Sequence, residues 1–208
     1  MRRGATQTKQ KYSERGRKVL RQVVWPSFMY VGITGTIGSG KAEATQILRR
    51  HGFVQYNTGD VLREIAAKRN IQATQPELRM LANELRREHG PEYLARELVK
   101  RCQRDTPKHA VFSSIRNIAE VRELRKLNGF VLVSLNAPRE VRSERVLARG
   151  RRDGITTDEE LMVEEDTQLE GSAHEPQLLD VMDAADVKVV NIGNLEEFEA
   201  ILRDELDI

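Results

Sequence analysis

The sequence contains a single cysteine and a single tryptophan, and all aromatic residues together make up 5% of its 208 positions. One cysteine, Cys102, cannot form an internal disulfide, so we expect a reducing, cytoplasmic compartment. Cys102 lies in an amphipathic helical pattern between Val99 and Arg104, and no sequence signal marks its thiol as activated. We therefore interpret Cys102 as an inert packing residue rather than a reactive thiol.

Long hydrophobic runs are also missing, since no stretch approaches the roughly 20 apolar residues that a membrane span needs. Charged residues make up 32% of the chain and hydrophobic residues 39%. This composition predicts a water-soluble protein without a membrane partner, long enough for one α/β domain and too short for two. The four histidines are scattered without the spacing of metal ligands, so no zinc site is predicted.

Acidic residues are almost missing from the first 28 positions. This segment carries eight basic residues and one acid, Glu14, which gives it a net charge of +7, whereas the whole chain carries +2. A cationic arm of this kind is suited to nucleic acid, anionic lipid or another protein, and equally to a targeting or solvated segment. The sequence does not choose among these. We treat residues 1–28 as a basic N-terminal extension of a domain at 29–208.

Five short apolar runs rich in β-branched residues alternate with helical patterns after Pro26. They predict strands at Tyr30–Gly35, Phe53–Asn57, Ala110–Ile115, Phe130–Asn136 and Val187–Ile192. Such near-continuous apolar runs are typical of parallel strands that helices cover on both faces. The order of elements therefore predicts one doubly wound α/β domain with a five-stranded parallel sheet.

Several predicted helices begin at side chains that can cap a first turn. The spacing of a capping box occurs in four pairs, Thr74 with Glu77, Asn117 with Glu120, Thr157 with Glu160, and Asn194 with Glu197. Gly90 and Gly129 stand where C-terminal caps belong. These signals divide the chain between the strands into helices.

A phosphate-binding loop of the Walker A type is predicted from Gly35 to Lys41, because Gly-Thr-Ile-Gly-Ser-Gly-Lys follows a strand and precedes a helix. Its glycines let successive N–H groups point at one anion, to which the helix N-terminus adds partial positive charge. The alternative, a glycine-rich turn with a surface lysine, explains fewer of the matched positions. The residues predicted to bind the phosphates of ATP are Gly35, Thr36, Gly38, Ser39, Gly40, Lys41 and Ala42.

Ala42 departs from the P-loop pattern, which calls for serine or threonine because that hydroxyl ligates Mg²⁺. Alanine has no oxygen to offer. We therefore expect phosphate binding to survive, while the placement of the Mg²⁺ that accompanies ATP is weakened.

Arginine-containing motifs follow the predicted strands. Thr58-Gly59-Asp60-Val61-Leu62-Arg63 comes directly after the second strand, Ile115-Arg116 after the third, and Arg145-x-x-x-Arg149-x-Arg151-Arg152-Asp153-Gly154 after the fourth. The first resembles the acceptor-binding turn of adenylate-kinase-like nucleoside monophosphate kinases, the second lies where they carry Asp-Gly-x-x-Arg, and the third resembles the lid of dephospho-coenzyme A kinases. Over about residues 29–205, the order of elements most resembles an archaeal-type P-loop branch related to these kinases.

The resemblance implies a P-loop NTPase fold with an acceptor-binding insert at about 58–105 and a lid at about 147–157. It also implies transfer of the γ-phosphoryl group of ATP, a reaction that needs cations on both sides of the moving group. The implied acceptor-binding residues are Thr58, Gly59, Asp60, Arg63 and Arg116. The implied catalytic residues are Lys41, Asp60, Arg145, Arg149 and Arg152.

Two further residues receive roles from the resemblance. Asp60 is the remaining acid suited to a metal-bound water, although it could instead cap a helix at Val61–Arg69. Asn191, at the end of the fifth strand, could approach an adenine base. The acidic run Glu164-Glu165-Asp166 is interpreted as a solvated helix face rather than a metal site.

Three functions remain open at this point. A kinase for a nucleoside or deoxynucleoside monophosphate is favoured over one for dephospho-coenzyme A, because the Thr-Gly-Asp…Arg turn suits an acceptor phosphate. Ser113 and Ser114 stand where the family carries an acid, and together with Ala42 they indicate a catalytically impaired nucleotide-binding module, a sensor or partner subunit. A nucleic-acid-associated protein acting through the arm is the third. The sequence does not predict an oligomeric state.

Overall fold

The computed structural model describes residues 28–148, 155–169, 171–172 and 174–208. Within these ranges, five parallel strands form one sheet in the order β2-β3-β1-β4-β5. They are β1 (Met29–Gly35), β2 (Val54–Asn57), β3 (His109–Ser113), β4 (Phe130–Asn136) and β5 (Val187–Val190). Each predicted strand overlaps an observed one, so the predicted doubly wound α/β fold is confirmed.

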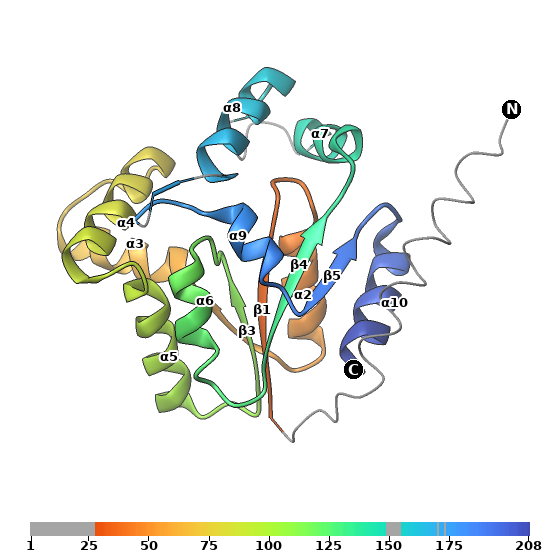
Figure 1. The fold of residues 1–208 in the computed structure, drawn as a ribbon, viewed down its shortest axis with the longest axis horizontal. Coiled ribbons are helices and arrows are strands. Elements are labelled where there is room, and N and C mark those ends of the chain that lie inside the picture. Colours follow the sequence, from red (N-terminus) through yellow and green to blue (C-terminus); the bar gives the residue numbers. More distant parts are fainter. Residues whose placement is uncertain (1–27, 149–154, 170, 173) are drawn as a thin grey trace, which may run out of the picture.

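Helices cover both faces of this sheet (Figure 1). On one face lie α2 (Lys41–Arg50) and α10 (Leu195–Leu206). The other face carries α5 (Tyr93–Asp105), α6 (Ile118–Leu124) and α9 (Leu178–Asp183), with α3 (Thr58–Lys68) and α4 (Gln75–His89) packed beyond them. Two helices, α7 (Arg139–Ala148) and α8 (Asp158–Leu169), lie over the carboxyl ends of the strands.

The core consists of two hydrophobic clusters on opposite faces of the sheet. Along β3, Ala110 and Phe112 belong to one cluster and Val111 to the other, and all three are fully buried. Because side chains of a strand alternate between its faces, burial on both sides requires the continuous apolar runs seen in the sequence. Cys102 belongs to the first cluster, where burial raises the pKa of its thiol to about 11. The interpretation of Cys102 as a packing residue is confirmed.

The four predicted N-terminal capping pairs are present. Asn117 and Asn194 each form a complete capping box with the glutamate three residues later. The backbone N–H groups of Glu77 and Glu160 donate to Thr74 Oγ1 and Thr157 Oγ1, respectively.

Two predictions about helix boundaries are wrong. The helix predicted at Val61–Arg69 begins at Thr58, because the side chain of Asn57 accepts the N–H of Gly59 and caps it. Asp60 therefore lies inside the first turn and is not the N-cap. Gly90 ends α4 as predicted, but Gly129 lies in the turn before β4, since α6 ends at Leu124.

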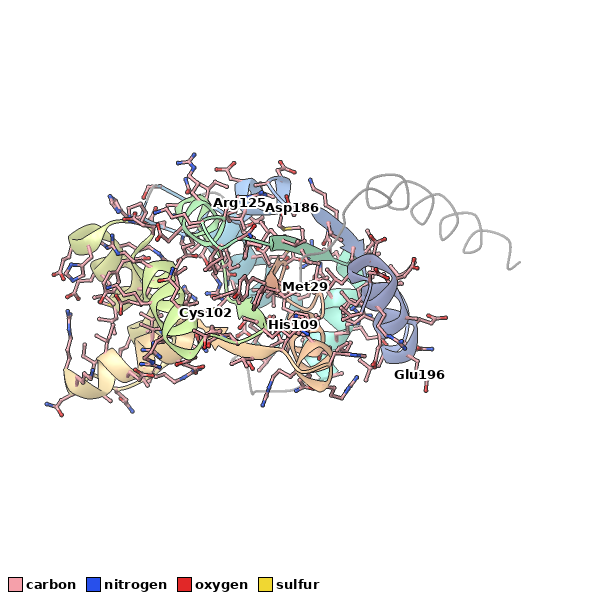
Figure 2. The ribbon with its side chains drawn as sticks, turned by 90° about the horizontal axis from the view of Figure 1, so that it is seen from below. Met29, Cys102, His109, Arg125, Asp186 and Glu196 are labelled. Carbon is pink, nitrogen blue, oxygen red and sulfur yellow. The ribbon has the colours of Figure 1, made fainter. Side chains whose placement is uncertain are left out.

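The lower edge of the sheet brings together the first residues of its strands. Met29 of β1 pairs with His109 of β3. Just before β5, Asp186 Oδ1 accepts a hydrogen bond from Nη2 of Arg125 at 2.9 Å (Figure 2). The same carboxylate accepts the backbone N–H of Leu132 at 2.8 Å. These contacts fix β5 beside β4.

Some predicted features fall outside the described residues. These are the arm up to residue 27 with Trp25, and residues 149–154 with Arg149 and Arg152 of the predicted lid. Among the described helices, none has both the length and the apolar content of a membrane-spanning segment.

Candidate functional site

The predicted phosphate loop joins the end of β1 to the start of α2. Gly35 and Gly40 adopt positive φ angles of 140° and 103°. A Cβ atom on Gly35 would lie 2.0 Å from the carbonyl oxygen of Leu135, and one on Gly40 would lie 2.4 Å from Nδ2 of Asn191. Only glycine fits at these two positions without displacing a neighbour, so the end of β4 and the residue after β5 restrict the path of the loop.

Lys41, the first residue of α2, folds back over the loop. Its Nζ atom donates to the carbonyl oxygens of Gly35 at 2.8 Å and of Thr36 at 2.7 Å. These bonds hold the ammonium group at the loop, where it can meet the phosphates of a nucleotide. Ser39 is fully buried in the same loop, and no partner of its hydroxyl is seen among the described residues.

Asn191, after the end of β5, bonds to the loop, and Arg145 bonds to Asn191. Asn191 is 5% exposed, and its Nδ2 donates to the carbonyl oxygen of Ser39 at 3.0 Å. Arg145, on α7, donates to the carbonyl oxygens of Asn191 and Gly193, each at 3.1 Å. The roles assigned from sequence, adenine binding for Asn191 and phosphate binding for Arg145, stay predictions.

Arg142 also bonds to the loop, and the sequence reasoning missed it. Its guanidinium is buried and donates to the carbonyl oxygens of Ala137 at 3.0 Å and Ile37 at 3.3 Å, and it forms an ion pair with Glu165. Burial lowers the pKa of Arg142 from its ordinary value. The expectation that the acidic run is a solvated face is therefore wrong for Glu165, whose side chain is 13% exposed. Glu164 is 28% exposed and pairs with Arg79, and Asp166 is exposed.

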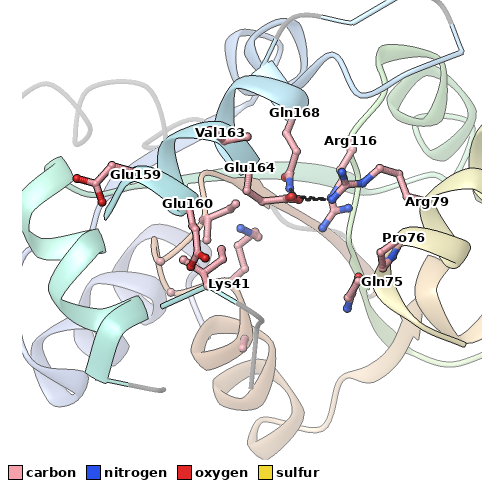
Figure 3. Close-up of a pocket in the computed structure, with 15 residues that line it drawn as sticks. Lys41, Gln75, Pro76, Arg79, Arg116, Glu159, Glu160, Val163, Glu164 and Gln168 are labelled. Carbon is pink, nitrogen blue, oxygen red and sulfur yellow. Dashed lines mark hydrogen bonds and ion pairs between the residues drawn. The ribbon is translucent and has the colours of Figure 1, made fainter. Parts of the chain in front are cut away.

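A cavity of about 740 Å³ opens above the phosphate loop. Lys41 and the loop form one wall, the first turns of α4 and Arg116 form the opposite wall, and α8 closes the top (Figure 3). Its volume is within the roughly 300–1,000 Å³ of small-molecule sites. The lining residues with polar or charged side chains are Lys41, Gln75, Arg79, Arg116, Glu159, Glu160, Glu164 and Gln168.

Arg116 follows β3 and lines this cavity, and its acceptor-binding role stays a prediction. Burial lowers the pKa of its guanidinium, and within the described residues that group has no hydrogen-bond partner. Its backbone is fixed on both sides. The Arg116 N–H donates to Glu120 Oε2 at 2.9 Å, and its carbonyl oxygen accepts the N–H of Gln177 at 2.7 Å. A well-positioned guanidinium that opens onto a cavity is suited to an anion.

Glu120 is in turn held by Arg86 of α4. The two side chains are 1% and 6% exposed and are 3.0 Å apart. The same carboxylate accepts the N–H groups of Arg116 and Asn117. Through this buried ion pair, α4 positions the loop that carries Arg116.

The structure does not bring the remaining acceptor-binding candidates to the cavity wall. Asp60 and Arg63 form an exposed ion pair of 2.8 Å with each other. Thr58 is buried and donates to the carbonyl oxygen of Ser114 at 3.3 Å, so it stabilises the turn. The acceptor roles of Thr58, Gly59, Asp60 and Arg63 stay predictions.

The donor set near the loop does not fit a Mg²⁺ ion held by protein side chains. Ala42 has no oxygen, and Asp60 is engaged by Arg63. Ser113, at the end of β3, is buried, and its hydroxyl has no partner among the described residues, but it brings no charge. No group of three or more His, Cys, Asp or Glu side chains in the described part of the chain could hold a metal ion. The loop fits phosphates, whereas a metal would need ligands from the nucleotide itself.

Comparisons with known proteins identify the family and the fold. Residues 31–192 match the profile described as an AAA domain. A UPF0200 protein of Methanosarcina mazei is 33% identical over 178 residues, which cover 85% of this chain and 92% of that protein. A UPF0200/UPF0201 protein of Archaeoglobus fulgidus is 36% identical over 172 residues, 81% of this chain. The match spans only 52% of the Archaeoglobus protein, about half of its length.

Solved structures share the fold. The protein TT1252 from Thermus thermophilus has a TM-score of 0.57 at 23% identity. The match covers 86% of this chain and 97% of TT1252. Shikimate kinase from Bacteroides thetaiotaomicron has a TM-score of 0.55 at 16% identity, with 86% of this chain and 99% of the kinase covered. At these identities the likeness shows the fold alone. This chain belongs to the UPF0200 family and has the nucleotide-binding fold of P-loop kinases.

Proposed function

We propose that this protein is a phosphotransferase that moves the γ-phosphoryl group of ATP to a small acceptor bearing a phosphate. The observation that supports this most is one cavity with cations on opposite walls, Lys41 on the loop side and Arg79 and Arg116 facing it (Figure 3). Transfer between two polyanions needs positive charge at both reactants. A nucleoside or deoxynucleoside monophosphate is the proposed acceptor, with dephospho-coenzyme A as the other candidate.

The proposed reaction forms one bond and breaks one. With a nucleoside or deoxynucleoside monophosphate as the acceptor, an oxygen of its phosphate attacks the γ-phosphorus of ATP, and the bond from that phosphorus to the β–γ bridging oxygen breaks. ADP leaves with the electron pair. A phosphate monoester is already mostly dianionic at neutral pH, so the attacking oxygen needs no general base.

In this proposal the residues divide into a donor group and an acceptor group. The loop amides of 35–42 and the Lys41 ammonium bind the ATP phosphates. Arg116 binds the acceptor phosphate, and helices α3 to α5 form the acceptor-binding insert with Thr58, Gly59, Asp60 and Arg63. The lid arginines Arg145, Arg149 and Arg152 are proposed to contact the transferred group. Mg²⁺ is proposed to arrive with ATP, and no step is assigned to it.

A nucleotide-binding module without turnover is the second candidate, and specific residues favour it. Ala42 lacks the hydroxyl that the P-loop pattern places beside Mg²⁺, and Ser113 supplies no negative charge at the end of β3. If both losses are decisive, the protein binds ATP and does not transfer phosphate.

The deciding experiment measures ADP release from Mg·ATP with each common nucleoside and deoxynucleoside monophosphate and with dephospho-coenzyme A. Lys41→Ala serves as the blank, and Lys188→Ala, which removes an exposed lysine of β5, serves as the matched control. We expect release that depends on one acceptor, disappears in Lys41→Ala and persists in Lys188→Ala. ATP binding by calorimetry without release above the blank would instead establish the binding module.

Ala42→Ser then tests the metal defect. If placement of Mg²⁺ limits turnover, restoring the hydroxyl raises Mg²⁺-dependent ADP release above that of the parent protein. An Ala42→Ser variant with unchanged release would rule out Ala42 as the cause of slow turnover.

A further inference from the structure

Two helices that line the cavity, α4 and α8, are joined by an ion pair. Nη2 of Arg79 on α4 lies 2.6 Å from Oε1 and 2.7 Å from Oε2 of Glu164 on α8. Nε2 of Gln168, one turn further along α8, donates to the same carboxylate at 2.8 Å. All three side chains line the cavity (Figure 3). The Glu164 carboxylate therefore lies inside the proposed acceptor site and accepts bonds from cavity residues.

Among the charged groups around Arg116, positive charge exceeds negative charge. Arg116 is near enough to Glu164 and Arg79 for their charges to act on its guanidinium, yet that group has no hydrogen-bond partner in the described ranges. The other nearby acid, Glu120, is already balanced by Arg86. Two arginines thus share the single negative charge of Glu164, and only Arg79 is bonded to it.

We propose that Arg79 and Arg116 together form a subsite for a phosphate dianion, and that the Glu164 carboxylate occupies this subsite until the phosphate displaces it. The inference rests on the proposed function, because it names the group through which the acceptor is held. A phosphate monoester carries more charge and more acceptor oxygens than a carboxylate, so it can bond both guanidinium groups at once.

The exchange is energetically accessible. Arg79 and Glu164 are 44% and 28% exposed at the side chain, and ion pairs with this access to water contribute little to stability. Displacement of Glu164 breaks one contact between α4 and α8, while the buried pair of Arg142 and Glu165 still holds α8 beside the phosphate loop. Phosphate binding therefore releases α8 from α4 without detaching it from the loop.

The test titrates inorganic phosphate into the parent protein and its variants by calorimetry. The phosphate loop is the same in all of them, so differences between variants report the subsite. Glu164→Gln removes the competing charge and is expected to tighten phosphate binding about five- to tenfold. Arg79→Ala is expected to remove this gain when it is combined with Glu164→Gln. Circular dichroism confirms that each variant is folded.

Asp166→Asn is the matched control, because it removes one negative charge from an exposed position on the same helix, outside the cavity lining. Equal tightening by Asp166→Asn and Glu164→Gln would overturn the proposal, since it would mark a general charge effect. No tightening in Glu164→Gln would overturn it as well, even if the protein proves to be a kinase. If Glu164→Gln tightened the binding of acetate as much as the binding of phosphate, the assignment of the subsite to a phosphate would be overturned. The titration needs no turnover, so the subsite can be established even if ADP release fails.

Discussion

The side-chain amide of Asn191 donates to the carbonyl oxygen of Ser39, which links the end of β5 to the middle of the phosphate loop. The same amide nitrogen occupies the space that a side chain on Gly40 would need. Asn191 is itself fixed by Arg145, whose Nη2 lies 3.3 Å from Asn191 Oδ1. The shape of the loop thus depends on a residue about 150 positions away in the sequence.

Asn191→Asp tests this dependence. The substitution preserves shape but replaces the donor by an oxygen that faces the Ser39 carbonyl, so a buried hydrogen bond becomes a repulsive contact. We expect a loss of about 1–3 kcal/mol in unfolding free energy and weaker ATP binding, measured by urea unfolding and calorimetry. Asn194→Asp is the control, because aspartate caps a helix as well as asparagine does. Normal ATP affinity in folded Asn191→Asp would show that the loop holds its shape without this bond.

The buried pair of Arg86 and Glu120 should be sensitive to loss of one partner. Glu120→Gln leaves the Arg86 charge buried without its counter-ion, so we expect a loss of about 3–5 kcal/mol in unfolding free energy. Urea unfolding measures it. Glu84→Gln, which breaks the exposed pair with Arg69, should cost less than about 1 kcal/mol. Similar small losses in both variants would mean that the Arg86 guanidinium finds water or another partner.

Ser114 has a φ angle of 68°, in the left-handed region that favours glycine. Ser114→Gly is expected to relieve this strain and raise the unfolding free energy by about 1 kcal/mol. Ser113→Gly, at the end of β3, should lower it by roughly 0.5–1 kcal/mol, because glycine adds freedom to the unfolded chain. Chemical unfolding of the two variants should therefore move in opposite directions. A loss in both would indicate that the Ser114 side chain has a contact worth more than the strain.

The sequence was sufficient for features that depend on neighbouring residues. Strands followed from continuous apolar runs, caps from residues three positions apart, and the phosphate loop from seven consecutive positions between a strand and a helix. Asn57 and Asp60 show the limit of such signals. Both are good capping residues, and only the observed start of α3 at Thr58 distinguishes them.

The candidate site depended on contacts between distant parts of the chain, which local patterns do not contain. Arg79 and Glu164 are 85 positions apart, and neither lies in a motif. On α7, the sequence placed Arg145 in a lid motif and gave Arg142 no role, yet Arg142 contacts the loop at Ile37 and Arg145 contacts the end of β5. Their different roles follow from how the helices pack on the sheet.

His109 makes stability depend on pH. Its ring lies 5.2 Å from that of Phe53, and its Nδ1 is buried without a partner among the described residues. Burial, helped by the charge of Lys108, lowers the pKa of His109 below 6.5. Below about pH 6.5 the unfolded chain therefore binds a proton that the folded chain still refuses. Stability should fall as the pH drops through 6.5, and the fall should end below the lowered pKa of the folded state.

His109→Gln isolates this contribution, because glutamine cannot take up a proton. The measurement is the urea midpoint at pH 7.5 and pH 5.5 for the parent and the variant. Hydrogen bonds from Arg101 to Glu64 and from Arg104 and Tyr56 to Asp105 lower the pKa values of these two carboxylates, so both stay ionised throughout this window. We expect the midpoint of the parent to decrease at pH 5.5 and that of His109→Gln to change less. An equal decrease in both proteins would assign the pH dependence to another group.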